Sequence, residues 1–191
     1  SATTGCKLPG FLKRKIRKSA HLLSPISPSR LTEELQKIIN SSHSFDIISK
    51  TLETDLYMYL QPAATAIMYS NAAFERKYLS NLKKLDEFVA KNPEARLGEK
   101  LYFMIYDFIS ELTDWKKEAS AHSAAGELYL KTWTECRNFV LPMNPQRSEL
   151  EFAIRKVLKN LGIQMYTPKK PKKESKTSSG SSVNSTEISK K

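Results

Sequence analysis

The chain has 191 residues and a formal net charge of +11, from 31 basic and 20 acidic side chains. The charge is segregated: residues 1–32 hold seven Lys and Arg and no acid, residues 167–191 hold seven Lys and two Glu, and the middle carries −1. This layout excludes a globally basic fold such as a histone-like body. It predicts two basic arms around a nearly neutral body.

Cysteine usage and hydropathy narrow the class of protein further. Cys6 and Cys136 are 130 positions apart, so no disulfide framework or metal knuckle is predicted, and a reducing, intracellular compartment is favoured. The longest apolar run, residues 101–106, has six residues, far fewer than the roughly 20 that a membrane-spanning helix needs. Residues 1–23 lack the cleavage site and the long apolar core of a secretory signal.

The first predicted element is a short basic amphipathic helix. Apolar residues recur at helical spacing from Phe11 to Leu23, and five Lys and Arg side chains lie between them. The segment 24–28, Ser-Pro-Ile-Ser-Pro, ends this helix because each proline disfavours helix in the residue before it. Residues 1–26 are therefore interpreted as an arm and its linker.

Helical periodicity continues through residues 27–166, and strand signals are nearly missing. A break near Ser70-Asn71 is left open, because both residues favour helix caps over helix interiors. The last helix is predicted to start with Asn144 as its cap and Pro145 in its first turn, and to end just before Gly162. The apolar stripes of the body fall within residues 31–39, 45–60, 67–89, 101–115, 128–140 and 150–161.

Residues 167–191 are rich in Lys and Ser and too poor in apolar side chains to offset the entropy of ordering. The sequence thus predicts an arm (1–26), an all-helical domain (27–166) and a disordered basic tail (167–191). The predicted fold class is all-α. It is a single compact bundle or a short irregular superhelix of six to seven helices, with a basic N-terminal arm helix.

Residues suited to catalysis are few and scattered. His21, His43 and His122 are not spaced to share a helical face with a carboxylate or with another His. Cys136 lies on an apolar stripe, which favours a core residue over a nucleophile. No glycine-rich phosphate-binding loop occurs. We therefore expect no catalytic, metal or cofactor site, and we predict that the chain is not an enzyme.

The sequence leaves the use of the basic arm open among an anionic membrane, the body itself, and nucleic acid or an import receptor. Cys6 is a candidate for S-acylation, which would add a second membrane anchor. Ser24 and Ser27 each precede a proline and are candidate phosphorylation sites. The residues assigned to membrane or anion binding are Phe11, Leu12, Lys13, Arg14, Lys15, Ile16, Arg17 and Lys18.

A lysine cluster near the C-terminus, made of Lys169, Lys170, Lys172 and Lys173, resembles a monopartite nuclear localisation signal. Non-specific attraction to phosphate and a role in solubility alone are the alternatives. Three basic residues near the end of the last predicted helix could extend this cluster onto the body, although compensation of the helix dipole explains them as well. They are Arg155, Lys156 and Lys159.

These features together favour a non-enzymatic interaction or regulatory module. Its helical body would bind another protein, while its basic arms direct it to the nucleus or to an anionic surface. One alternative is a peripheral membrane adaptor anchored by the arm helix, and another is a non-specific RNA- or DNA-binding protein. The expected location is intracellular, either nuclear or cytoplasmic, with attachment to a membrane surface as a variant.

Overall fold

The computed structural model describes residues 7–112 and 124–163. Within these ranges the chain forms nine α-helices and one 3-10 helix and no strand, which confirms the all-α prediction. The elements are α1 (Gly10–Ser19), η1 (Ala20–Leu23), α2 (Pro28–Asn40), α3 (Ser44–Glu53), α4 (Tyr57–Leu60), α5 (Pro62–Ser70), α6 (Ala72–Lys91), α7 (Leu97–Leu112), α9 (Ala124–Phe139) and α10 (Arg147–Asn160).

The body contains more helices than the six to seven that the sequence predicts, because two long apolar patterns are interrupted. The first pattern breaks between α3 and α4, where Asp55 adopts a left-handed conformation with φ 59°. The second breaks at Asn71, where the sequence had left the choice open. The Asn71 side chain accepts hydrogen bonds from the backbone N–H groups of Ala73 and Phe74 and so caps α6.

Carboxylates from distant helices complete the first turns of α3 and α7. Asp86 of α6 accepts hydrogen bonds from the backbone N–H groups of Ser44 (2.6 Å) and Phe45 (2.9 Å). Glu149 of α10 accepts one from the N–H of Gly98 (2.5 Å) and also binds the Arg96 guanidinium. Gly98 lies so close to α10 that a Cβ atom there would be 2.7 Å from the Glu149 carbonyl oxygen.

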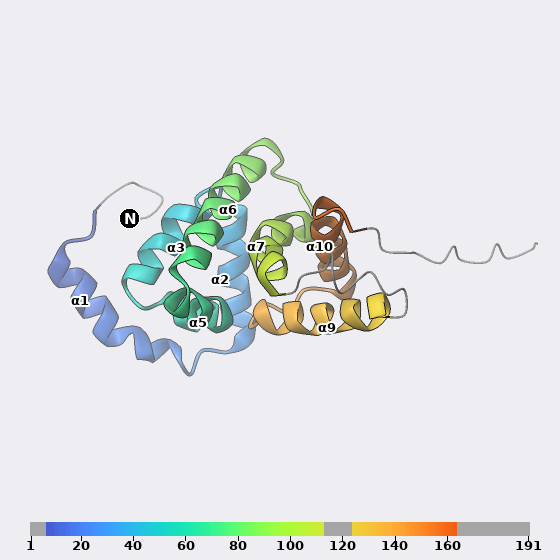
Figure 1. The fold of residues 1–191 in the computed structure, drawn as a ribbon. Coiled ribbons are helices and arrows are strands. Elements are labelled where there is room, and N and C mark those ends of the chain that lie inside the picture. Colours follow the sequence, from blue (N-terminus) through green and yellow to red (C-terminus); the bar gives the residue numbers. More distant parts are fainter. Residues whose placement is uncertain (1–6, 113–123, 164–191) are drawn as a thin grey trace, which may run out of the picture.

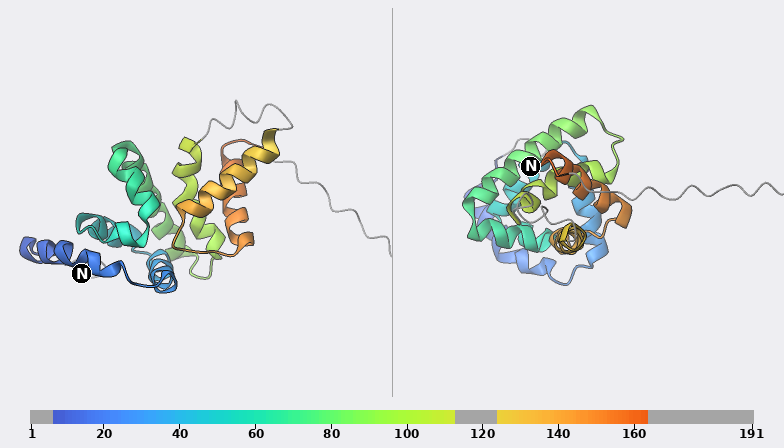
Figure 2. Two further views of the ribbon diagram at one scale, coloured as in Figure 1. Left: turned by 90° about the horizontal axis from the view of Figure 1, so that it is seen from below. Right: turned by 45° about the vertical axis from the view of Figure 1, so that its right-hand side comes forward.

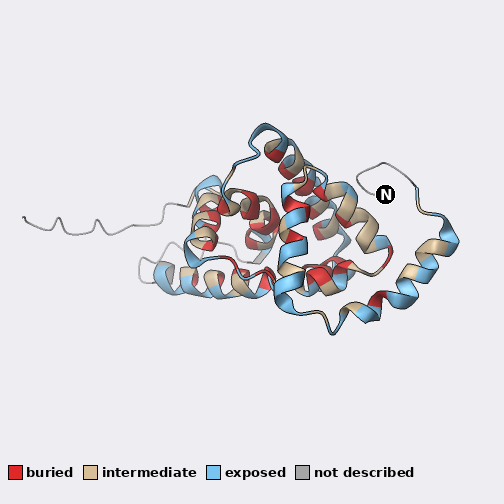
Figure 3. Ribbon diagram, turned by 180° about the vertical axis from the view of Figure 1, so that it is seen from behind, coloured by how far each residue is buried: buried red, intermediate tan, exposed pale blue. Residues whose placement is uncertain are grey.

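The helix α7 occupies the centre of the fold. It packs against α6 on one side and α10 on the other, and it also contacts α9 (Figure 1). The buried side of each body helix faces this centre (Figure 3). The largest fully buried side chains are Tyr57, Tyr78, Phe74, Phe139, Leu35, Ile39, Ile48, Leu82, Leu85, Leu101, Met104 and Ile105.

The helix α1 lies at one end of the molecule, and α9 and α10 lie at the other (Figures 1 and 2). No residue of α1 is buried, and Ala20 of η1 is the first buried residue along the described chain. The arm therefore meets the body along one side only.

A buried polar triad joins three body helices. The hydroxyl of Tyr57 donates to Gln61 Oε1 (2.6 Å), the hydroxyl of Tyr78 approaches the same oxygen (3.0 Å), and the two hydroxyls are 2.9 Å apart. Gln61 Nε2 donates to the Phe139 carbonyl at the end of α9 (3.4 Å). Burial raises the pKa of both tyrosines, so the hydroxyls stay protonated at neutral pH.

The start of the last helix differs from its prediction. The helix α10 begins at Arg147, with Gln146 in the capping position and no side-chain cap. The Asn144 side chain instead accepts a hydrogen bond from Arg137 of α9 (2.7 Å). The predicted end is confirmed, because Gly162 follows α10 with φ 80°, a conformation that glycine adopts without strain.

Among the helices of the described ranges, none combines the length and the apolar character needed to cross a membrane. The helix α6 has 20 residues, but it carries eight charged side chains.

We expect Gln61→Leu to lower the free energy of unfolding by about 2 to 4 kcal/mol, because the two buried hydroxyls can then pair only with each other and the Phe139 carbonyl loses its donor. Tyr78→Phe should cost about 1 to 2 kcal/mol, since it removes one hydroxyl and leaves the other two groups paired. Urea unfolding followed by circular dichroism measures both. Gln146→Leu, at an exposed position, serves as the control. An unchanged midpoint for Gln61→Leu would show that the triad does not stabilise the fold.

Candidate nucleic-acid interface

The basic side chains of α1 are divided between two faces of the helix. Lys13 and Arg17 are one helical turn apart and both point to the body. Lys13 forms an ion pair with Glu53, and Arg17 pairs with Asp55 (3.0 Å) and donates to the Glu53 carbonyl (2.6 Å). Glu53 is the last residue of α3 and Asp55 lies in the turn after it, so the end of that helix and this turn hold the arm.

The opposite face of α1 is basic and open to solvent. Arg14, Lys15 and Lys18 are exposed, and none of them pairs with a carboxylate in the part of the chain that the structure describes. Two apolar side chains accompany them on this side, Phe11 with 67% and Leu22 with 64% of its surface exposed. We call these five residues the outward arm face.

The remaining predicted arm residues, Leu12 and Ile16, are half-buried and lie on the same side of α1 as Lys13. The two apolar positions are therefore turned toward the body rather than outward. Ser24 and Ser27 are exposed in the linker between η1 and α2. Cys6 and the predicted import cluster Lys169, Lys170, Lys172 and Lys173 lie outside the described residues.

An acidic cleft of about 360 Å³ opens beside the docked arm, between α3, α5 and α6. Its floor is apolar, with Leu52 and Met68 among the lining residues, and Glu53 and Glu75 add two carboxylates. Tyr69 lines the cleft as well, and its hydroxyl donates to Asp55 (3.4 Å). The body is thus acidic where α1 meets it, so the arm presents positive charge only on its outward face.

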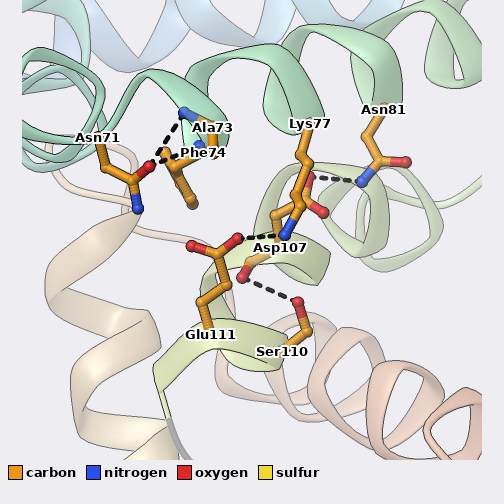
Figure 4. A network of polar contacts seen from close by, with 8 residues as sticks. All are labelled: Asn71, Ala73, Phe74, Lys77, Asn81, Asp107, Ser110 and Glu111. Carbon is orange, nitrogen blue, oxygen red and sulfur yellow. Dashed lines mark hydrogen bonds and ion pairs between the residues drawn. The ribbon is translucent and has the colours of Figure 1, made fainter.

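A polar network connects α6 and α7 (Figure 4). Asn81 Nδ2 donates to the Asp107 carboxylate (2.6 Å), and Lys77 pairs with Glu111 (2.7 Å) one turn further along α7. Asp107 is 5% exposed, and burial raises the pKa of its carboxyl above the ordinary 3.8, an effect that the Asn81 hydrogen bond opposes. These groups pair with one another across the helix contact.

The other groups considered for catalysis lie apart from this network. Cys136 is fully buried, and burial raises the pKa of its thiol well above the ordinary value. His21 is exposed, with Nδ1 beside the Lys18 carbonyl (2.9 Å), and His43 is exposed before α3. No group of three or more metal-ligating side chains comes together among residues 7–112 and 124–163. His122 is outside these ranges.

A family model described as "Probable RNA and SrmB-binding site of polymerase A" matches residues 12–68. The match covers 57 of the 191 residues, from the first turn of α1 into α5. It contains most of the outward arm face and both carboxylates that hold the arm. No curated protein and no solved structure matches the chain. Among the alternatives drawn from the sequence, the match agrees with RNA binding.

We expect Asp107→Asn to be at least as stable as the parent chain at pH 7, because it keeps an acceptor for Asn81 and removes a charge from a buried site. Its advantage should shrink at pH 4. A raised pKa means that the folded state binds the proton more tightly, so the cost of the native carboxylate is absent at low pH and grows as the pH rises. Urea unfolding at the two pH values measures this difference.

Asp107→Leu is the contrasting variant. It leaves the buried amide of Asn81 without its acceptor and should be about 2 kcal/mol less stable than Asp107→Asn at both pH values. A difference between Asp107→Asn and the parent chain that stays constant from pH 4 to pH 7 would contradict the assigned shift.

Proposed function

We propose that this chain is an RNA-binding module whose outward arm face contacts the phosphate backbone. The observation that carries the proposal is the division of charge on α1 within a segment similar to an RNA-binding family model. Arg14, Lys15 and Lys18 have no carboxylate partner among the described residues, which leaves these cations available to phosphates. Phe11, exposed beside them, offers a ring on which an unpaired base can stack.

A membrane is less well matched to the same face. An amphipathic helix that lies in a bilayer inserts a continuous apolar stripe. The predicted stripe is Phe11, Leu12, Ile16 and Leu23. Leu12 and Ile16 are turned toward the body and Leu23 is half-buried, so only Phe11 of the stripe remains outward, and Leu22, outside the stripe, is exposed as well. RNA binding requires fewer apolar contacts and more free cations, which is what α1 presents.

The module binds rather than catalyses in this proposal, in line with the scattered histidines and the buried Cys136. A protein partner for the body is a second candidate, favoured by the family description, which names SrmB beside RNA. Binding of purified SrmB to the full chain, measured by size-exclusion chromatography in nuclease-treated samples, tests it. The proposed import role of the C-terminal lysines is separate, and fusion of residues 164–191 to a neutral reporter tests it.

Replacing Arg14, Lys15 and Lys18 with Gln should weaken binding of a single-stranded RNA oligomer. If each side chain neutralises one phosphate, the slope of log K against log salt concentration should become shallower by about 2. Fluorescence anisotropy with a labelled oligomer at several salt concentrations measures this slope.

The matched control is the triple variant Arg76→Gln, Lys91→Gln, Lys131→Gln, which removes the same charge from exposed body positions. Equal losses in the two triple variants would mean that overall charge, and not the outward arm face, attracts RNA. Full binding by the arm variant would refute the proposed function.

The double variant Glu53→Gln, Asp55→Asn tests whether the docked position of α1 matters. If only the electrostatic attraction between the chain and RNA matters, removal of two negative charges should strengthen binding. If the carboxylates position the arm, the affinity should instead fall, by up to about fivefold for each exposed ion pair lost. Glu33→Gln, Glu94→Gln changes the charge equally at two exposed positions and should not weaken binding. Tighter binding by the first double variant would eliminate the positioning role.

A further inference from the structure

Aromatic side chains form a continuous strip on the surface where α6, α7 and α10 meet. Along α7, Tyr102 contacts Phe103 (5.0 Å between ring centroids) and Tyr106 (5.6 Å), and Phe103 continues the strip to Phe88 of α6 (5.4 Å). All four side chains are half-buried, so each keeps part of its ring surface accessible. We call these four residues the aromatic strip.

The strip results from how α7 divides its apolar residues. Leu101, Met104 and Ile105 fill the core, which is the role that the sequence favoured for this whole aromatic-rich segment. Tyr102, Phe103 and Tyr106 lie on the opposite side of the helix, where they pack against the core at its margin and stay partly exposed. Packing in the core therefore explains only part of the apolar surface of α7.

A lysine stands over the strip. The Lys156 ammonium of α10 is 5.0 Å from the ring centre of Tyr102 and 5.7 Å from that of Phe88. No carboxylate of the described residues pairs with it, and Lys159 is exposed one turn further along α10. The Glu149 carboxylate, seven residues before Lys156 on α10, binds Arg96.

The ligand that fits such a surface has flat rings and negative charge. Base stacking on aromatic side chains, with lysines for the phosphates, is how proteins hold single-stranded nucleic acid. Apolar helices of a protein partner would leave Lys156 without a counter-charge.

We propose that the aromatic strip and Lys156 form a second RNA contact that stacks unpaired bases, outside the segment matched by the family model. This proposal rests on the proposed function and adds a requirement for single-stranded RNA. Since α1 and α10 lie at opposite ends of the molecule, the arm and the strip would bind different parts of one strand (Figure 2). The arm would supply most of the cations that contact phosphates, and the strip would supply most of the rings on which bases stack.

The test compares three ligands on the full chain: a 12-nucleotide oligoadenylate, an abasic oligomer with the same number of phosphates, and a duplex. The parent chain should bind the oligoadenylate at least about fivefold more tightly than the abasic oligomer. The variant Tyr102→Leu, Phe103→Leu keeps apolar bulk but removes two rings, and should lose most of this preference for the oligoadenylate. Lys156→Gln should weaken binding of both oligomers.

The control is Phe45→Leu, which removes a half-buried ring that also lies under a lysine, Lys83 (4.4 Å). It should leave base preference intact, and circular dichroism confirms that all variants are folded. Equal affinity of the parent chain for oligoadenylate and abasic oligomer would overturn the proposal, as would a Tyr102→Leu, Phe103→Leu chain that keeps its base preference. Such a chain would point to a protein ligand for the strip.

The arm variants separate this failure from failure of the proposed function. If the parent chain shows no preference for bases but its affinity depends on salt as expected for the arm, only the proposal for the strip fails. If replacement of Arg14, Lys15 and Lys18 leaves the affinity for RNA unchanged, the proposed function of the arm fails, whatever the strip does.

Discussion

The shared oxygen of Gln61 is the constraint on which the body depends. It is the acceptor for two tyrosine hydroxyls from α4 and α6, while the amide nitrogen of the same side chain reaches the end of α9. The two hydroxyls have one proton each, so two of the three close contacts are hydrogen bonds at any moment, and Gln61 Oε1, which has no proton, can only accept. Tyr57 and Gln61 belong to the segment similar to the RNA-binding model, but Tyr78 and Phe139 lie beyond it. The matched segment therefore depends on the rest of the chain for its own core, and a boundary drawn at residue 68 would open that core.

The division of charge on α1 explains how a chain with a nearly neutral body can display a directed basic surface. Within the described ranges, two of the five cations on the helix pair with carboxylates, Glu53 at the end of α3 and Asp55 just after it, and the other three have no carboxylate partner. The matched pair fixes which way the unmatched three point. A net charge counted over the whole sequence carries no such direction, which is why the arm could be assigned to membrane, body or nucleic acid with equal reason from its composition.

The helical class, the linker at Ser24–Pro28 and the helix end before Gly162 follow from local patterns, and the structure agrees with them. The caps that Asp86 and Glu149 supply to α3 and α7 could not be predicted from local patterns. From the sequence both carboxylates are ordinary residues of polar helix faces, because their partners are about 40 and 50 positions away. For Asn144, local rules predict a helix cap, but its side chain accepts a hydrogen bond from Arg137 instead. The outward direction of Arg14 depends on Glu53 and Asp55, and the aromatic strip on a contact between α7 and α10. Side-chain partners so far apart leave no periodic signal.

The glycine at position 98 has a consequence for the next turn of α7. Because no side-chain atom fits between Gly98 and the Glu149 carbonyl, this point fixes how far α7 is shifted along α10. Tyr102 lies four residues after Gly98, and Lys156 lies seven residues after Glu149 on the same side of α10. The position of the Lys156 ammonium over the aromatic strip therefore depends on the absence of a Cβ atom at position 98, one turn before Tyr102. Alanine at position 98 would displace the lysine from the rings without touching either of them.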